Sequence, residues 1–144
     1  MAHIEDLGSQ FDAPLDAVWK FLQSPDDHGS SHKDRRNVEG APDPEGGLRT
    51  SWEQNVNGNW VKVVNRVTMF PPVAVMVQSL EGPLAGSKFL MYYRANGAKT
   101  IVNVVGDFHS AMIPPAQLEP MVLASLESAY NDDNAALRHF AAKK

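Results

Sequence analysis

The amino-acid sequence predicts an α+β fold, in which a curved antiparallel sheet of about six or seven strands wraps around one long C-terminal helix. The observation behind this is a double change of hydrophobic period. Apolar residues recur at helical spacing in residues 13–22, alternate as in strands from about Leu48, and return to helical spacing from about Gln117. Turn signals such as Asn57-Gly58 separate the alternating segments, which is typical of consecutive hairpins.

The elements follow in order along the chain. Residues 3–11 are expected to form a strand, and Ala13–Leu22 a helix with Pro14 in its first turn. A second short helix is expected from Ser24, which offers an N-cap hydroxyl before Pro25. Further strands are expected at residues 48–56, 60–69, 73–80, 89–94 and 100–108. The last helix has roughly 25 residues and begins between Pro115 and Pro120; a helix that long needs a wide, bent sheet to lie on.

Length and composition exclude several classes of function. The 144 residues fit one domain, 1–144, and the net charge is −4. The only dense basic cluster, Lys33 to Arg36, is interrupted by Asp34, so nucleic acid is not an expected partner. The chain has no cysteine, which removes disulfides and thiolate chemistry. No apolar run is long enough to enter a membrane as a helix, and the first ten residues lack a signal-peptide core, so a cytoplasmic location is expected.

Charged residues sort most strands into an inner and an outer face, because side chains alternate along a strand. Arg49, Glu53, Lys62 and Arg66 should face water, and their neighbours should then face the long helix. The resulting inner wall is neutral, without a charged strand residue. Residues 73–80 are apolar on both faces. We assign Met76, Gln78 and Leu80 to the inside, which leaves Val73, Val75 and Val77 outside as a surface for a possible homodimer.

The order of elements resembles the helix-grip fold of the SRPBCC superfamily. This superfamily includes START lipid-transfer domains, polyketide cyclases, birch-pollen-type allergens and plant hormone receptors. Phe11-Asp12-Ala13-Pro14-Leu15-Asp16-Ala17-Val18-Trp19 is similar to the opening motif F-x-A-P-x-x-x-V-W of bacterial polyketide cyclase-like members. The resemblance covers essentially the whole chain and implies an apolar cavity between sheet and helix. Members bind lipids, sterols, hormones or polyketides, and a minority catalyse cyclisation or dehydration; fold alone does not choose among these.

We therefore predict a cavity that binds an apolar or amphipathic small molecule, lipid-, terpenoid- or polyketide-like. A few neutral polar groups would orient the ligand, and any charge on it would stay at the mouth, near His28, His32 or His109. The predicted ligand-binding residues are Trp52, Gln54, Asn65, Val67, Met69, Leu84, Phe89, Met91, Tyr93, Phe108, Val122, Leu126, Tyr130, His28 and His32.

His28 and His32 are the residues most suited to chemistry. On a continuous helix they would share a face and suit a metal, but Gly29 and two serines interrupt the spacing, so no metal site is expected. Asp133 lies on the apolar stripe of the last helix and is expected to reach water near the end of the sheet.

Three functions remain open. The first is a carrier without catalytic activity or cofactor, and the second is a cyclase or dehydratase that uses an acid or base in the same cavity. The third is an interaction domain with a filled core. The carrier is preferred, because the inner wall offers few groups that move protons.

Overall fold

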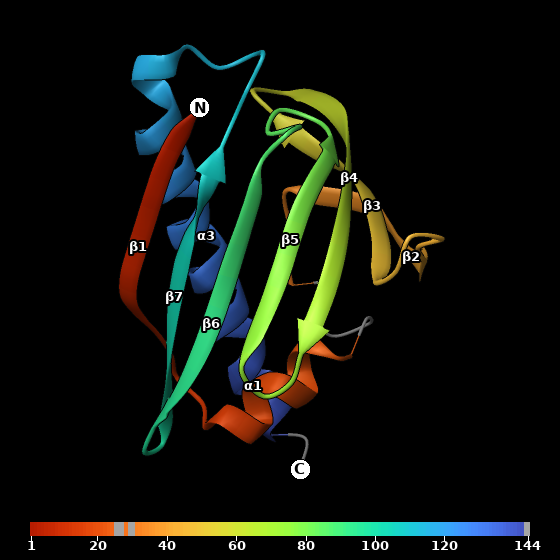
Figure 1. The fold of residues 1–144 in the computed structure, drawn as a ribbon. Coiled ribbons are helices and arrows are strands. Elements are labelled where there is room, and N and C mark those ends of the chain that lie inside the picture. Colours follow the sequence, from red (N-terminus) through yellow and green to blue (C-terminus); the bar gives the residue numbers. More distant parts are fainter. Residues whose placement is uncertain (25–27, 29–30, 143–144) are drawn as a thin grey trace.

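The computed structural model describes residues 1–24, 28 and 31–142. Seven strands form one antiparallel sheet in the order β1-β7-β6-β5-β4-β3-β2, and the long helix α3 lies across one face of it (Figure 1). This confirms the predicted fold class. The strands are β1 (Ala2–Phe11), β2 (Arg35–Pro42), β3 (Leu48–Val56), β4 (Asn59–Phe70), β5 (Ala74–Glu81), β6 (Lys88–Asn96) and β7 (Lys99–Phe108); the helices are α1 (Leu15–Leu22) and α3 (Pro115–Ala142).

The two helices follow the predicted apolar spacing. α1 begins one residue after Pro14, which is its extended N-cap rather than a first-turn residue. α3 has 28 residues, and every residue of its predicted apolar stripe is buried or half-buried. The second short helix was predicted on residues that, except for Ser24 and His28, lie outside the described part of the chain. Neither α1 nor α3 is both long and apolar enough to cross a membrane.

The β3–β4 hairpin confirms the strongest local signal of the sequence. Asn57 and Gly58 both have positive φ, 53° and 86°, and Val56 pairs with Asn59 across the turn. Two consecutive positive φ values define the type I′ turn, whose twist matches that of the flanking strands. The turn fixes the register in which Trp52 pairs with Val63, so both side chains point toward α3 as predicted.

The predicted faces of β5 are wrong. Val75 pairs with Met69 and Val77 with Val67, and paired residues share a face, so both valines point inward. They are 6% and 7% exposed and belong to the core. Gln78 lies on the outer face, where Arg66 donates a hydrogen bond to it, and Met76 and Leu80 are not part of the inner wall. The homodimer predicted from an outward valine row therefore loses its basis.

Strand β2 was not predicted as a separate element. Its sequence carries Arg35, Arg36 and Gly40 and shows no alternation of apolar residues, because it is an edge strand that pairs only with β3. The register nevertheless matters for the site. Arg35 pairs with Gln54, and therefore faces inward with it. The expectation of an inner wall without charged strand residues is wrong at this position.

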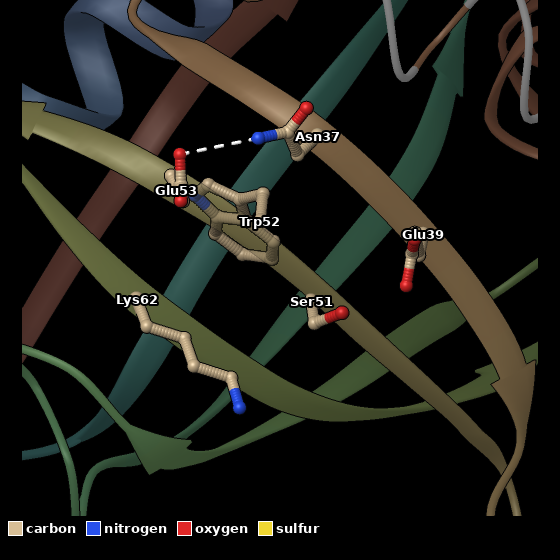
Figure 2. A pocket seen from close by; sticks show the side chains of 6 residues that line it. All are labelled: Asn37, Glu39, Ser51, Trp52, Glu53 and Lys62. Atoms are coloured by element: carbon tan, nitrogen blue, oxygen red, sulfur yellow. Dashed lines mark hydrogen bonds between the residues drawn. The ribbon is translucent and has the colours of Figure 1, made fainter.

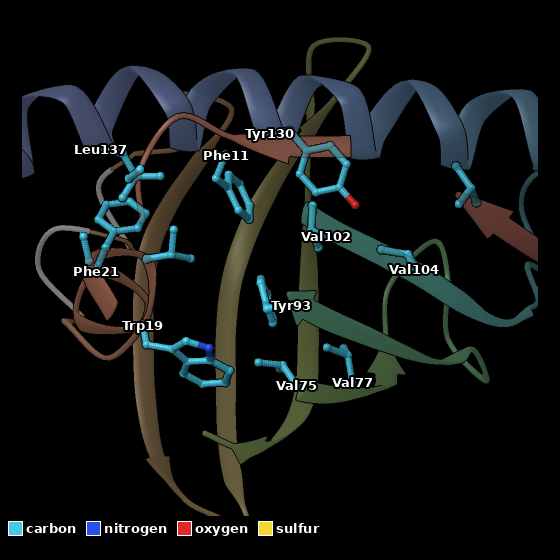
Figure 3. Packing of buried hydrophobic residues seen from close by; sticks show 14 of the residues in the cluster. Phe11, Trp19, Phe21, Val75, Val77, Tyr93, Val102, Val104, Tyr130 and Leu137 are labelled. Atoms are coloured by element: carbon cyan, nitrogen blue, oxygen red, sulfur yellow. The ribbon is translucent and has the colours of Figure 1, made fainter. Parts of the chain in front are cut away.

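The core lies between α1, α3 and the inner faces of β1, β7, β6 and β5 (Figure 3). Aromatic rings form its centre: Tyr93 stacks on Phe11 with ring centroids 6.2 Å apart and meets Trp19 edge-on at 5.3 Å. The Trp19 indole N–H donates to the Pro72 carbonyl at 2.8 Å, which ties α1 to the β4–β5 turn. Core packing is therefore concentrated on one half of the sheet.

α3 is anchored along the β1 edge. The Asn134 amide oxygen accepts the Asp12 N–H at 2.9 Å, and its NH₂ group donates to the Gln10 carbonyl at 3.2 Å. Arg138 lies 3.3 Å from the Asp12 carboxylate. Within the described part of the chain, the other side-chain hydrogen bonds and ion pairs of α3 go to residues 28, 31 and 32. The opposite side of the helix faces the inner surface of β3 to β5.

Candidate functional site

Apolar side chains on the inner face of β4 and β6 form a wall on the side of the sheet where α3 lies, called the apolar wall below. They come together because Val67 pairs with Val77, Val77 with Phe89, Val75 with Met91, and Met69 with Val75. Unlike the core valines, the larger side chains of this wall are half-buried, although they pack against the core. The predicted site residues in this half-buried state are Trp52, Gln54, Asn65, Val67, Met69, Leu84, Phe89, Met91 and Leu126.

The other predicted apolar or aromatic site residues lie deeper. Tyr93 and Tyr130 are each 6% exposed, Val122 is 3% exposed and Phe108 1%. Phe108 stacks on Phe89 with centroids 5.0 Å apart, so it supports the apolar wall from within. These four residues belong to the core, and Figure 3 shows Tyr93 and Tyr130 among the packed core side chains.

Two polar atoms of this region are buried and have no hydrogen-bond partner among the described groups: the Asn65 side-chain oxygen and the Tyr130 hydroxyl. Burial raises the pKa of the Tyr130 hydroxyl, and the charges of Asp6 and Asp133 raise it further, so the group stays protonated. A buried polar atom without a partner costs free energy. Asn65 can accept a hydrogen bond here and Tyr130 can donate one.

A cluster of histidines and carboxylates lies beside the C-terminal half of α3. His32 Nε2 is 3.2 Å from Asp133 Oδ1, and His28 Nε2 is 3.5 Å from the same oxygen. The Ser31 hydroxyl donates to this oxygen at 3.0 Å. His32 Nδ1 lies 3.3 Å from a second carboxylate, Asp132 Oδ2. Asp133 Oδ1 is therefore contacted by three polar groups: two histidine nitrogens and one hydroxyl.

Burial makes this cluster more than a surface ion pair. The side chains of His32 and Asp133 are 4% and 9% exposed, whereas His28 is 32% exposed. The expectation that Asp133 reaches water at the end of the sheet is therefore wrong. Burial raises the pKa of Asp133, but the hydrogen bonds and charges of the His28 and His32 rings outweigh it and hold that pKa below its usual range.

A cation on β2 completes the polar side of the site. The Arg35 guanidinium lies over the Trp52 ring at 4.4 Å, and its Nε is buried without a hydrogen-bond partner among the described groups. Burial lowers the pKa of Arg35, while the charges of Asp34, Asp133 and Asp132 raise it. The Trp52 indole donates to Gln54 at 3.0 Å, and Gln54 donates to Asp34. Trp52 and Gln54 are thus partly engaged within the protein.

Two open hollows are lined by described residues, and neither is lined by Val67, Met69, Phe89 or Met91. The first, of about 190 Å³, is polar; of the predicted site residues it includes only Trp52 (Figure 2). Its lining is Asn37, Glu39, Ser51, Trp52, Glu53 and Lys62. The second, of about 260 Å³, lies where α3 begins and includes His109 and Leu118. His109 and the pair His28 and His32 were predicted around one mouth, but they lie toward opposite ends of α3.

The sequence drew attention to His28, His32 and Asp133 separately, but it did not predict that they lie close together. His28 and His32 were singled out by spacing, and Asp133 by its place on an apolar stripe, about 100 residues away. Arg35 was missed because β2 shows no strand pattern. The one available signal was the pair Arg35 and Arg36, of which only one can face inward on a strand.

Comparisons with known protein families and with curated proteins find no match. Solved structures match over nearly the whole chain. The START superfamily protein from Mycobacterium smegmatis has a TM-score of 0.79 at 8% identity, covering 95% of this chain and 97% of its own. Zhui aromatase/cyclase from Streptomyces sp. R1128 has 0.70 at 18% identity, covering 94% and 90%. Ara h 8.0201 has 0.72 at 13% identity, covering 96% and 98%.

The chain has the START-like helix-grip fold. This confirms the fold that the opening motif and the order of elements implied. At these sequence identities the similarity shows the fold alone. The similar structures include an aromatase/cyclase, but also a START superfamily protein and Ara h 8.0201. The helix-grip architecture therefore does not decide the function, which has to be argued from the side chains of the candidate site.

Proposed function

We propose that this helix-grip chain binds an apolar or amphipathic small molecule, lipid-, terpenoid- or polyketide-like, between its sheet and α3. The observation that carries the proposal is the half-buried apolar wall of Val67, Met69, Phe89 and Met91 opposite the helix. A ligand that buries about 250 Å² of apolar surface there gains roughly 6 kcal/mol before association costs. Apolar contact therefore supplies most of the affinity.

The buried polar atoms that lack a hydrogen-bond partner should determine which ligands are preferred. Asn65 Oδ1 would accept a hydrogen bond from a ligand hydroxyl, and the Tyr130 hydroxyl would donate to a ligand carbonyl. Each bond adds about 0.5–1.5 kcal/mol. An ionised ligand group has no counter-charge on the apolar wall, so it belongs beside the Arg35 guanidinium and the histidines. The preferred ligand has a neutral ring or chain with one or two oxygen functions.

The test is a thermal-shift screen of neutral aromatic and terpenoid compounds against small charged metabolites. Neutral compounds should raise the melting temperature and charged ones should not. Asn65→Leu should reorder the hydroxylated ligands, while Asn131→Leu, an exposed change on α3, should leave the ranking as in wild type. The proposal fails if only charged metabolites stabilise the protein. The role of Asn65 fails if its variant keeps the wild-type ranking.

A second candidate function is a cyclase or dehydratase that works on the same ligand. The observation that favours it is the half-exposed ring of His28, whose Nε2 lies 3.5 Å from the buried Asp133 carboxylate. A histidine oriented by a carboxylate is suited to accept and return a proton, which accelerates such reactions by about 10²–10⁴-fold. The test is to measure turnover of a bound β-keto compound by wild type and by His28→Gln. A rate at least tenfold lower in the variant, with ligand affinity unchanged, would favour the enzyme over the carrier.

A further inference from the structure

Three possible metal ligands, His28, His32 and Asp133, lie close together. One ligand atom from each lies within 4.8 Å of the other two. The two nitrogen–oxygen distances are 3.5 and 3.2 Å. Ligand atoms that bind one tetrahedral ion at 2.0–2.1 Å are about 3.3–3.4 Å apart. Both nitrogen–oxygen distances are therefore compatible with one metal ion held between the three side chains.

His32 stands between two carboxylates. Its two ring nitrogens each face one of them, Asp132 on one side and Asp133 on the other. An imidazole that binds a metal through Nε2 carries its proton on Nδ1. Metal binding between His32 Nε2 and Asp133 Oδ1 would therefore leave the His32 Nδ1–H facing Asp132.

The surroundings fit the same conclusion. A histidine that binds a metal through one nitrogen almost always donates its other N–H to a carboxylate or carbonyl, and Asp132 is placed to accept it from His32. Three carboxylates (Asp34, Asp132 and Asp133) interact with the single guanidinium of Arg35. An added divalent cation would offset this excess of negative charge.

We propose that His28, His32 and Asp133 bind a divalent transition metal ion of the Zn²⁺ type, with Asp132 orienting His32. Two imidazoles and one carboxylate suit Zn²⁺ or Co²⁺ and disfavour Mg²⁺, which takes oxygen ligands. Three protein ligands leave a coordination position open, on the side of the half-exposed His28, for water or a ligand oxygen. This inference does not rest on the proposed apolar ligand. It opposes the expectation from sequence that no metal binds, and one titration decides between them.

The experiment is isothermal titration of metal-free, tag-free protein with ZnCl₂, repeated with CoCl₂ and MgCl₂. Wild type should bind one Zn²⁺ per chain, and bound Co²⁺ should show the intense visible bands of a four- or five-coordinate ion. His28→Gln and His32→Gln should each lower the affinity by more than about tenfold, and Asp132→Asn by about tenfold. Mg²⁺ should give no saturable signal.

The matched control is His3→Gln, which removes an exposed histidine that also contacts two carboxylates, Glu5 and Asp107. This variant should bind Zn²⁺ as wild type does. If buried His32→Gln loses its fold by circular dichroism, the half-exposed His28→Gln decides. The proposal is overturned if wild type binds no Zn²⁺, or if His28→Gln binds it as tightly as wild type. Ligand binding in the thermal-shift screen is measured without metal, so the two proposals can fail separately.

Discussion

Removing the Tyr130 hydroxyl should stabilise the ligand-free protein. Most buried tyrosines lose stability when changed to phenylalanine, because they lose a hydrogen bond. Tyr130 is 6% exposed and its hydroxyl has no partner among the described groups. The ring makes an edge-on contact with Phe11 at 5.6 Å, which phenylalanine would keep. Tyr130→Phe therefore removes a desolvated polar group and leaves the packing intact.

The size of the effect follows from the cost of an unpaired buried polar group, about 1–3 kcal/mol. We expect Tyr130→Phe to raise the free energy of unfolding by about 1–2 kcal/mol. For a chain of 144 residues, each kcal/mol shifts the melting temperature by about 3 °C. Tyr130→Phe should also lower the affinity for a carbonyl-bearing ligand by up to about tenfold, because the hydrogen bond that the Tyr130 hydroxyl could donate to the carbonyl is lost.

Urea unfolding at 25 °C measures the first effect, and ligand titration measures the second. Tyr92→Phe is the matched control, because Tyr92 lies half-buried on the outer face of β6. Its stability should stay within about 0.5 kcal/mol of wild type. If Tyr130→Phe lowers the free energy of unfolding by about 1 kcal/mol, the hydroxyl has a hydrogen-bond partner in solution. Its assignment as a donor that is free for a ligand would then be wrong.

Three further changes test the packing, the β2–β3 connection and the sheet. Leu137→Ala, at a residue 1% exposed, should cost about 2–5 kcal/mol in urea unfolding, and a loss below 1 kcal/mol would mean that the core collapses around it. The Glu45 N–H and two arginines, among them Arg66, lower the pKa of Asp43. The stabilising effect of this carboxylate is therefore present above its unfolded pKa of about 4 and is lost as pH falls through the lower folded value. Asp43→Asn should melt at a lower temperature than wild type at pH 7, and this difference in melting temperature should shrink below about pH 4; a difference that grows there would contradict the prediction. Gly106→Ala would place a Cβ 2.3 Å from the Cβ of Phe89 and should lower the melting temperature markedly, which a wild-type melting curve would contradict.

Local patterns predicted the sheet wherever charge marked one face. On β3 and β4 the alternation of charged and apolar residues predicted the correct inner face, and Asn57-Gly58 predicted the turn between them. Between Ala74 and Leu80, β5 carries no charged residue that would mark a face, and Val77 was placed on the wrong side. That assignment depends on pairing with β4, a tertiary relation that one strand's sequence does not contain.

The polar cluster shows a different limit. His28 and His32 attracted attention by spacing, and Asp133 by standing where an apolar residue belongs, but no local rule joins them. Their meeting depends on how α3 lies relative to the segment that follows α1. The register of β2, which brings Arg35 to the same region, was likewise inaccessible because β2 has no strand pattern of its own.

The anchoring of α3 along one edge has a consequence for the breadth of recognition. Asn134 and Arg138 join the helix to the β1 end, and Asp132 and Asp133 join it to residues 28, 31 and 32, whereas the apolar wall on β4 and β6 has no described hydrogen bond or ion pair to the helix. The spacing between this wall and the helix therefore depends on side-chain volume and sheet curvature rather than on directional bonds. If a ligand binds there, we expect ligands of different volume to be accepted at little energetic cost, and to be ranked by polarity more sharply than by size.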